Sequence, residues 1–468
     1  MRMREPAFKL LPQPTPVALA GRRVLVLGLG DTGLSVARWV EREGGKARVA
    51  DTRKIPPRAK ELAGELHTGR FKKTLLKDVD LVCISPGLAL SDPLVQEAIA
   101  RGLPVLGDIE LFAWALGERA GTRVIAVTGT NGKSTVTALT GHLLREAGVA
   151  CEVAGNIGPP ALEALMQQRR SPAAAWVLEL SSYQLETTWS LAPDAAAMLN
   201  LSEDHLDRYA GLAEYATAKA RIFLGAGLQV LNRCDSASMA MARAGGPQVT
   251  FGLDAPPVSE DFGLIAAGGH DWLARGAERF LASDALTLFG AHNVSNALAA
   301  CALAHAAGVP LEQFGAGLRS FRGLPHRLER VALRDGVAWY DDSKGTNVGA
   351  TIAALQGLGQ KAVLIAGGDG KGQDFAPLAG PVRAYARAVL LIGRDAALIE
   401  RALAAGGLSG SVTVERCRTL GEAVARAAQL ASSGEAVLLS PACASFDMFR
   451  DYRERGEAFA SAVRALGR

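Results

Sequence analysis

Short apolar runs alternate with helical stretches from one end of this chain to the other, and this alternation restricts the fold most strongly. It is the order in which helices wind around parallel sheets, so we expect an α/β protein. The pattern starts afresh in three places, which predicts three domains of residues 1–112, 113–323 and 324–468. The length of 468 residues agrees with this division, because one hydrophobic core seldom extends that far.

The first and central domains are each expected to open with a strand, a glycine-rich turn and a helix. In the first domain the strand covers residues 24–27, the helix passes through Trp39, and a second strand ends at Asp51. The central domain opens with a strand at 124–127 and a helix from Lys133 to about Ala147. Further strands are expected at residues 81–84, near 105, and at 176–180, 196–199, 337–340, 362–366, 389–392 and 437–439.

The composition excludes several classes of function. A net charge of +4, without basic runs interleaved with aromatic residues, predicts no nucleic-acid partner. No stretch approaches the roughly 18 uncharged apolar residues of a membrane-spanning helix. The apolar segment of a signal peptide is missing, because Pro12, Pro14 and Pro16 interrupt the start of the chain. Six scattered cysteines without a C-x-x-C pair suit a reducing compartment, so we expect a cytoplasmic protein.

The segment Gly129-Thr130-Asn131-Gly132-Lys133-Ser134 lies between the strand and the helix that open the central domain. In such a turn, backbone N–H groups and the helix N-terminus face a phosphate, the lysine adds a positive charge and the serine can ligate Mg²⁺. Val127 stands where the general pattern G-x-x-x-x-G-K-[ST] has its first glycine, so the general match is incomplete. A glycine turn with a solvated lysine is the simpler alternative, but turn, lysine, hydroxyl, strand and helix coincide here. We therefore expect ATP binding.

A second glycine-rich turn follows the first strand, with Gly28, Gly30 and Gly33 in the pattern G-x-G-x-x-G, and Asp51 ends the next strand. This arrangement is typical of dinucleotide-binding domains, so NAD or FAD is a serious alternative. The same helix N-terminus is equally suited to the diphosphate of a UDP-sugar. The phosphate loop downstream favours a ligase with two nucleotide sites over a dehydrogenase.

Several segments together resemble the Mur ligase family, whose members join amino acids to UDP-N-acetylmuramic acid precursors. The variant loop G-T-N-G-K-S is itself the loop of this family. The other matching segments are residues 179–186, 203–209, 324–327, 342–347 and 367–371. Within the family they are most similar to the glutamate-adding members, and the resemblance extends along nearly the whole chain.

This resemblance implies an ATP-dependent ligase of peptidoglycan precursor synthesis with Rossmann-like domains at both ends. The first domain is expected to bind UDP-N-acetylmuramoyl-L-alanine, the central domain ATP and two Mg²⁺ ions, and the last domain glutamate. The alanyl carboxylate would become an acyl phosphate, which the glutamate amine then attacks to form an amide. The resemblance implies D-glutamate and a monomer, although the spacing of residues does not itself distinguish D- from L-glutamate.

The family's catalytic residues correspond to Lys133, Glu179, His205 and Lys219. By resemblance, Ser134, Glu179 and His205 hold Mg²⁺, and Lys219 reacts with CO₂ to become a carbamate ligand of the second ion. Glu179 also ends an apolar run, which predicts a place at the carboxyl end of a strand, where α/β sheets bind ligands. The ATP-binding positions implied are Gly129, Thr130, Asn131, Gly132, Lys133, Ser134, Thr135, Asn296, Arg327 and Asp342.

The substrate-binding positions are carried over from the family in the same way. For the UDP-linked substrate they are Asp31, Thr32, Asp51, Thr52, Arg53, Gly87, Asn156 and His205. For glutamate they are Thr346, Lys371, Ser445, Phe446 through its backbone, and Tyr452. A cation and hydroxyl donors are what two carboxylates require. Phenylalanine is more usual in the family where Tyr452 stands, which leaves the fine specificity open.

Outside these motifs each residue has an ordinary interpretation, such as a helix cap, a turn asparagine or a solvated lysine. Three other functions therefore stay open. A sibling ligase would prefer another amino acid, and an NAD-dependent oxidoreductase would bind its cofactor at 28–33. A non-catalytic regulator would bind ATP and release no phosphate.

Overall fold

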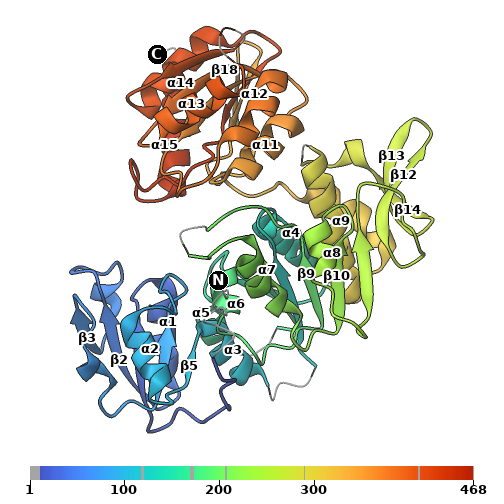
Figure 1. Ribbon diagram of the computed structural model, residues 1–468. Coiled ribbons are helices and arrows are strands. Elements are labelled where there is room, and N and C mark those ends of the chain that lie inside the picture. The colour runs from blue at the N-terminus through green and yellow to red at the C-terminus, as the bar shows by residue number, and fades with distance from the viewer. Residues whose placement is uncertain are drawn as a thin grey trace, which may run out of the picture.

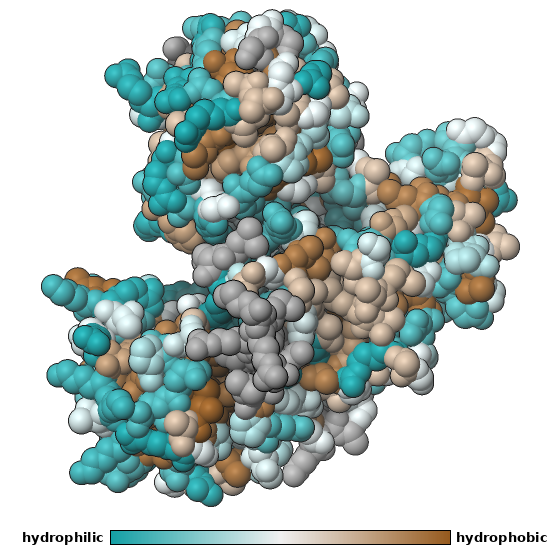
Figure 2. All heavy atoms as spheres, in the orientation of Figure 1, coloured by the Kyte–Doolittle hydropathy of each residue, from teal (hydrophilic) through white to brown (hydrophobic). Residues whose placement is uncertain are grey.

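The computed structural model describes residues 11–117, 121–168, 173–205, 208–288, 290–408, 410 and 412–466. These residues form three α/β domains, each with its own mostly parallel sheet, and the domains follow one another along the chain (Figure 1). The three-domain α/β fold predicted from the alternation of strands and helices is confirmed. In Figure 2 the first and last domains stand out as separate lobes with a hollow between them.

The first domain has a parallel sheet in the order β3-β2-β1-β4-β5. Its strands are β1 (Arg23–Leu27), β2 (Lys46–Asp51), β3 (Glu65–Thr68), β4 (Leu81–Ile84) and β5 (Val105–Leu106). Its helices are α1 (Asp31–Arg42), α2 (Pro93–Ala100) and α3 (Asp108–Leu116). The strand order reverses between β1 and β4, and the turns that follow these two strands meet where Ser85 Oγ donates to the Gly28 carbonyl at 3.1 Å. Ligands of open α/β sheets bind at such a reversal.

The central domain has a sheet in the order β14-β13-β12-β11-β10-β9-β6-β8-β7. Its parallel strands are β6 (Arg123–Thr128), β7 (Cys151–Gly155), β8 (Ala175–Glu179), β9 (Ala195–Met198), β10 (Leu228–Asn232), β11 (Gln248–Phe251) and β12 (Phe262–Ala267). Its helices are α4 (Lys133–Glu146), α5 (Ala161–Gln167), α6 (Ser182–Leu185), α7 (Leu212–Ala220), α8 (Ser236–Ala240), α9 (Ala291–Ala306) and α10 (Phe314–Ser320). Helices α4 and α9 pack against each other, and apolar residues from both join the core of this domain.

An antiparallel extension, which the sequence analysis did not predict, continues the central sheet. Strands β13 (His270–Arg275) and β14 (Glu278–Ala282) add to β12 as hairpins. Gly268 and Gly269 occupy the first turn and Gly276 the second, all with positive φ, which glycine adopts most readily. The extension projects away from the other two domains in Figure 1.

The C-terminal domain has a sheet in the order β15-β16-β20-β17-β18-β19, in which only the β15–β16 pair among the described strands is antiparallel. Its strands are β15 (Glu329–Arg334), β16 (Val337–Asp341), β17 (Ala362–Gly367), β18 (Ala386–Ile392), β19 (Thr413–Arg416) and β20 (Ala436–Leu439). Its helices are α11 (Val348–Gly357), α12 (Ala379–Tyr385), α13 (Ala396–Ala405), α14 (Leu420–Leu430) and α15 (Tyr452–Ala465). The Asp451 carboxylate caps α15 by accepting hydrogen bonds from the Arg453 and Glu454 amides.

The first two domains share a hydrophobic core. One continuous cluster of buried residues contains Val26 of β1, Phe112 of α3 and Leu178 of β8. Phe112 meets Trp176 of β8 edge to face, with ring centres 4.8 Å apart. The C-terminal domain instead builds its cores from its own residues.

Candidate active site

The phosphate loop, residues 129–134, joins β6 to α4 through two glycines with positive φ. Gly129 has φ +153° and Gly132 has φ +83°. A Cβ on Gly132 would lie 2.4 Å from Asn296 Oδ1, so a larger residue does not fit between the loop and α9. Lys133 Nζ curls back to donate to the carbonyls of Gly129 and Thr130 at 2.9 and 2.8 Å. Burial lowers the pKa of Lys133.

Glu179 ends β8, as predicted, and its buried carboxylate is held from both sides. Ser134 Oγ donates to one oxygen at 2.5 Å, and Asn156 Nδ2 donates to the other at 2.6 Å. Arg327 reaches over from the C-terminal domain and donates to Ser134 Oγ at 2.5 Å. The carboxylate and the loop serine are therefore in direct contact, and a residue of another domain caps them.

Lys219 lies on α7 with only 1% of its surface exposed. Its Nζ donates to the Gly129 carbonyl at 2.7 Å and lies 4.7 Å from the centre of the Tyr215 ring. Burial, followed by the positive charge of Lys133, lowers the pKa of Lys219 well below its usual range. The neutral amine is the nucleophilic form of lysine, so this environment suits a reaction with an electrophile such as CO₂.

His205 follows β9 on a loop and has a left-handed backbone with φ +57°. Its Nδ1 lies 2.7 Å from the Tyr183 hydroxyl, and its Nε2 lies 3.7 Å from Asp204 Oδ2. Burial lowers the pKa of His205 to about 4, so the imidazole is neutral at pH 7. A neutral imidazole keeps one ring nitrogen available as a ligand or hydrogen-bond acceptor.

A cavity of about 280 Å³ lies between the central and C-terminal domains and brings all the predicted catalytic and glutamate-binding residues together. The predicted residues that line it are Thr130, Asn131, Gly132, Lys133, Asn156, Glu179, His205, Lys219, Arg327, Thr346, Lys371, Ser445, Phe446 and Tyr452. They come from nine segments of the chain, at residues 130–133, 156, 179, 205, 219, 327, 346, 371 and 445–452. We call this space the central cavity.

A second cavity of about 370 Å³ lies on the other side of the phosphate loop and also spans the two domains. The predicted ATP-binding residues that line it are Asn131, Gly132, Thr135, Asn296, Arg327 and Asp342. Burial raises the pKa of Asp342 to about 7, although Ser440 donates a hydrogen bond to its carboxylate at 2.7 Å. Asn131, Gly132 and Arg327 line both cavities, so a ligand in one is adjacent to a ligand in the other.

A third cavity of about 460 Å³ lies at the strand-order reversal of the first domain. It is lined by Gly28, Gly30, Asp31, Thr32, Asp51, Thr52, Arg53, Gly87 and Asn156, which include all the predicted UDP-binding residues except His205. Asp51 accepts hydrogen bonds from the Leu29 amide at 2.7 Å and from Arg53 Nη2 at 2.6 Å. Burial alone would raise the pKa of Asp51, but the hydrogen bonds from these donors hold it below its usual value. Asn156 lines this cavity and the central cavity, so it joins the two.

Comparison with known proteins identifies the family. The model of the Mur ligase middle domain matches residues 127–304, that of the MurD-like N-terminal domain 22–107, and that of the Mur ligase glutamate ligase domain 326–443. The UDP-N-acetylmuramoylalanine–D-glutamate ligase of Nitrosospira multiformis is 55% identical over 459 residues, covering 96% of each chain. The enzyme of the same name from Thiobacillus denitrificans is 54% identical over 468 residues, covering 96% of this chain and 97% of its own.

The chain belongs to the Mur ligase family. It is therefore an ATP-dependent ligase that forms an amide bond. The match of the first domain to a Mur ligase domain assigns the G-x-G-x-x-G turn to this family rather than to an oxidoreductase.

Solved structures of other Mur ligases share the fold of this one. The chain is similar to UDP-N-acetylmuramate–alanine ligase MurC from Thermotoga maritima, with a TM-score of 0.62, 21% identity and coverage of 95% and 99% of the two chains. MurF from Acinetobacter baumannii gives a TM-score of 0.62 at 19% identity, with coverage of 95% and 91%. Among the described residues, no helix has the length and apolar character needed to cross a membrane.

The donors of this Mur ligase fit a magnesium ion. Glu179 and Ser134 offer oxygen atoms within 2.5 Å of each other, and Mg²⁺ prefers oxygen ligands. His205 is neutral at pH 7 and lines the same cavity. Lys219, as an amine, is no oxygen donor, but its depressed pKa favours the neutral form that carbamate formation requires.

The sequence analysis missed several cavity residues of this Mur ligase. Lys344 lines both interdomain cavities and lies 3.9 Å from the centre of the Tyr452 ring. Burial lowers the pKa of Lys344 to about 7. Sequence reasoning could have identified Lys344 from its place in the matched segment 342–347. Tyr183, which lies within the matched segment 179–186, and His292, four residues before Asn296, also line cavities.

Proposed function

We propose that this Mur ligase joins D-glutamate to the alanyl carboxylate of UDP-N-acetylmuramoyl-L-alanine with ATP, in peptidoglycan precursor synthesis. The central cavity carries this proposal, because the phosphate loop and Glu179 face Lys371 and Ser445 across it. The names of the two relatives that are 54% and 55% identical support the choice of D-glutamate.

Each substrate then occupies one cavity. The UDP group lies in the cavity of the first domain, with its diphosphate at the N-terminus of α1. Its peptide end passes Asn156 into the central cavity, where the alanyl carboxylate meets the phosphate loop. The adenosine of ATP lies in the cavity that Asn296 and Asp342 line.

The reaction proceeds in two steps inside the central cavity. A carboxylate oxygen of the alanyl group attacks the γ-phosphorus of ATP, and ADP leaves, which gives an acyl phosphate. The amine of glutamate attacks the acyl carbon and loses a proton, and inorganic phosphate leaves as the amide forms. Lys133 and Arg327 stabilise the negative charge that develops on the transferring phosphoryl group. Positioning of the amine by Lys371, Thr346 and Ser445 supplies much of the remaining acceleration.

Two magnesium ions, held by Ser134 and Glu179 and by His205 and Lys219, would offset the charge of the phosphates. In the Lys219 carbamate, the Nζ lone pair bonds to the carbon of CO₂ and one N–H proton is released. The product is an anion with two oxygen donors in place of a cation. The buried position of Lys219 beside the Gly129 carbonyl supports this modification.

We also propose that the enzyme works as a cytoplasmic monomer, because ATP and nucleotide-linked precursors are supplied there and one chain contributes every cavity. The proposed units are residues 1–112, 113–323 and 324–468. Helix α3 spans the first boundary and thereby joins the first unit to the second.

The decisive experiment is phosphate release from ATP with UDP-N-acetylmuramoyl-L-alanine and a panel of D- and L-amino acids. We expect turnover with D-glutamate and turnover at least about 100-fold slower with L-glutamate, because the two enantiomers place their carboxylates differently. Turnover with neither glutamate, or preference for another amino acid, would reject the proposal.

A further inference from the structure

Arg455 of α15 is a charged residue that is almost completely buried, with 1% of its surface exposed. Its Nε donates to Ser343 Oγ at 3.0 Å, and its Nη2 donates to the carbonyls of Ser343 and Cys443 at 2.8 and 3.1 Å. Within the described chain, no carboxylate lies within 4.0 Å of this guanidinium. Burial lowers the pKa of Arg455 to about 10, so the group stays charged at neutral pH.

The acceptors of Arg455 belong to the two loops that carry the proposed glutamate ligands. Ser343 lies three residues before Thr346, and Cys443 lies two residues before Ser445. The loops also contact each other directly, because the Ala442 amide donates to the Gly345 carbonyl at 2.9 Å. One guanidinium therefore holds the backbone of both loops.

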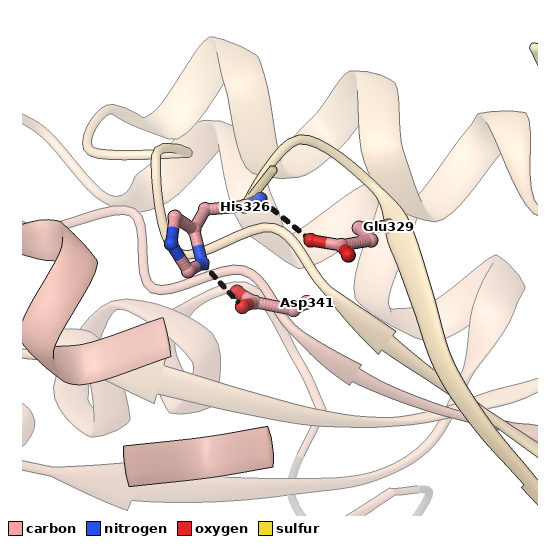
Figure 3. A group of neighbouring side chains, drawn as sticks. All are labelled: His326, Glu329 and Asp341. Atoms are coloured by element: carbon pink, nitrogen blue, oxygen red, sulfur yellow. Dashed lines mark hydrogen bonds and ion pairs between the residues drawn. The ribbon is translucent and has the colours of Figure 1, made fainter. Parts of the chain in front are cut away.

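The same network continues to the segment that carries Arg327. The Ser343 amide donates to Asp341 Oδ1 at 2.9 Å, and Asp341 Oδ2 lies 2.7 Å from His326 Nδ1 (Figure 3). Gly456, next to Arg455, packs against this pair so closely that a Cβ there would lie 2.3 Å from His326 Nδ1. Helix α15 thus supports the glutamate loops and the segment that carries Arg327 together.

The His326, Glu329 and Asp341 group is compact enough to suggest a cation site, since its ligand atoms lie within 4.8 Å of one another. Its hydrogen bonds explain the arrangement without a cation. Figure 3 shows the Glu329 carboxylate at the His326 backbone amide, 3.0 Å away, and the Asp341 carboxylate at the imidazole. We treat the group as part of the support beneath the loops.

Arg455 forms no direct ion pair, and the carboxylates of Asp447, Asp341 and Asp342 stabilise its charge only from farther away. Burying a guanidinium in this way costs free energy, and an apolar side chain of similar length would avoid that cost. We propose that Arg455 is a positioning residue for the amino-acid substrate: it fixes both loops and supplies positive charge behind them, for which the dicarboxylate serves as counter-ion. This inference rests on the proposed use of glutamate. It predicts an effect on glutamate binding that is separate from ATP binding.

The test is the steady-state kinetics of Arg455→Met in the full-length enzyme. We expect the KM for D-glutamate to rise at least about tenfold, because the charge and three hydrogen bonds are lost. The KM values for ATP and UDP-N-acetylmuramoyl-L-alanine should stay within about twofold. Arg464→Met is the matched control, since Arg464 lies in the last turn of the same helix at the surface. It should leave all three KM values unchanged.

Ser343→Ala provides a second variant that removes one hydroxyl without emptying the core. Its expected effect is a rise of about threefold in the KM for D-glutamate alone. If Arg455→Met does not fold, Ser343→Ala tests the same inference. Unchanged KM values for glutamate in the folded variants, or equal rises in all three KM values, would overturn the inference. A wild-type enzyme that uses no glutamate would overturn the proposed function first, and this inference with it.

Discussion

The two interfaces between domains differ in chemistry. The first and central domains share one apolar core, in which Phe112 packs on Trp176. The central and C-terminal domains meet through polar side chains, with Asn347 donating to Asn131 at 3.0 Å and Arg327 to Ser134 at 2.5 Å. Water replaces polar contacts readily, whereas separating an apolar core exposes it. We therefore expect the first two domains to move as one body and the third to open and close on them.

The first domain and the central cavity also differ in whether their charged side chains form ion pairs. In the first domain Asp51 and Arg53 neutralise each other at 2.6 Å. In the central cavity Lys219 is buried and Lys133 and Lys344 are half-buried, and none of the three forms an ion pair with a described carboxylate. Unpaired buried cations favour anionic ligands. The polar interface is thus where anionic substrates contribute most to closure.

Lys219→Ala should have the largest effect. We expect turnover to fall at least about 1,000-fold, because the variant lacks the proposed ligand of the second magnesium ion. Formate or acetate should restore part of the activity by supplying a carboxylate in its place. Phosphate release measures both effects, and Lys361→Ala, at an exposed lysine, is the control. Normal turnover of Lys219→Ala would show that this lysine has no role in the reaction.

Phe112→Ala tests the apolar interface. We expect the free energy of unfolding to fall by about 3 kcal/mol, because a buried aromatic ring is removed from the shared core. Denaturant titration measures this change. The KM for glutamate should stay constant, since the third domain is not involved. If Phe112→Ala lost glutamate binding without losing stability, the apolar interface would be the mobile one, contrary to our expectation.

Arg327→Met tests the polar interface. We expect kcat/KM for ATP to fall about 100-fold, because the variant loses a charge at the proposed site of phosphoryl transfer and a contact between domains. Stability should change little, in contrast to Phe112→Ala. Arg330→Met, at an exposed arginine three residues away, is the control. Equal kinetics of the two variants would count against closure through Arg327.

The pH dependence of nucleotide binding should show the smallest effect. Lys344 has a pKa lowered by burial to about 7, so it is charged below pH 7 and loses its charge as the pH rises above 7. The dissociation constant of a non-hydrolysable ATP analogue should rise at most about fivefold between pH 7 and pH 8. Calorimetry with wild type and Lys344→Met isolates this contribution. A pH dependence that is identical in both proteins would exclude Lys344 as its source.

Local patterns predicted the parallel strands well, because each buried strand is a short apolar run with a turn after it. Strand β4 lies at residues 81–84 as expected, and Glu179 ends its strand. The antiparallel extension was missed because its strands are partly exposed and lack a continuous apolar run, although Gly268, Gly269 and Gly276 marked its turns.

The predicted site residues came mostly from family motifs rather than from spacing. Physical reasoning alone placed the phosphate loop and Glu179, since both depend on one strand and its turn. It did not find Lys344 or Arg455, because their burial depends on how α15 and distant loops pack in three dimensions. A lysine or arginine in a sequence is by default a surface residue.

Transfer of an oxygen isotope tests the central claim most directly. UDP-N-acetylmuramoyl-L-alanine labelled with ¹⁸O in the alanyl carboxylate is incubated with the enzyme, ATP and D-glutamate, and the released phosphate is analysed by mass spectrometry. If the carboxylate is phosphorylated in the central cavity and then attacked by the amine, one ¹⁸O atom appears in each phosphate. Phosphate without ¹⁸O, released together with ligated product, would contradict the account.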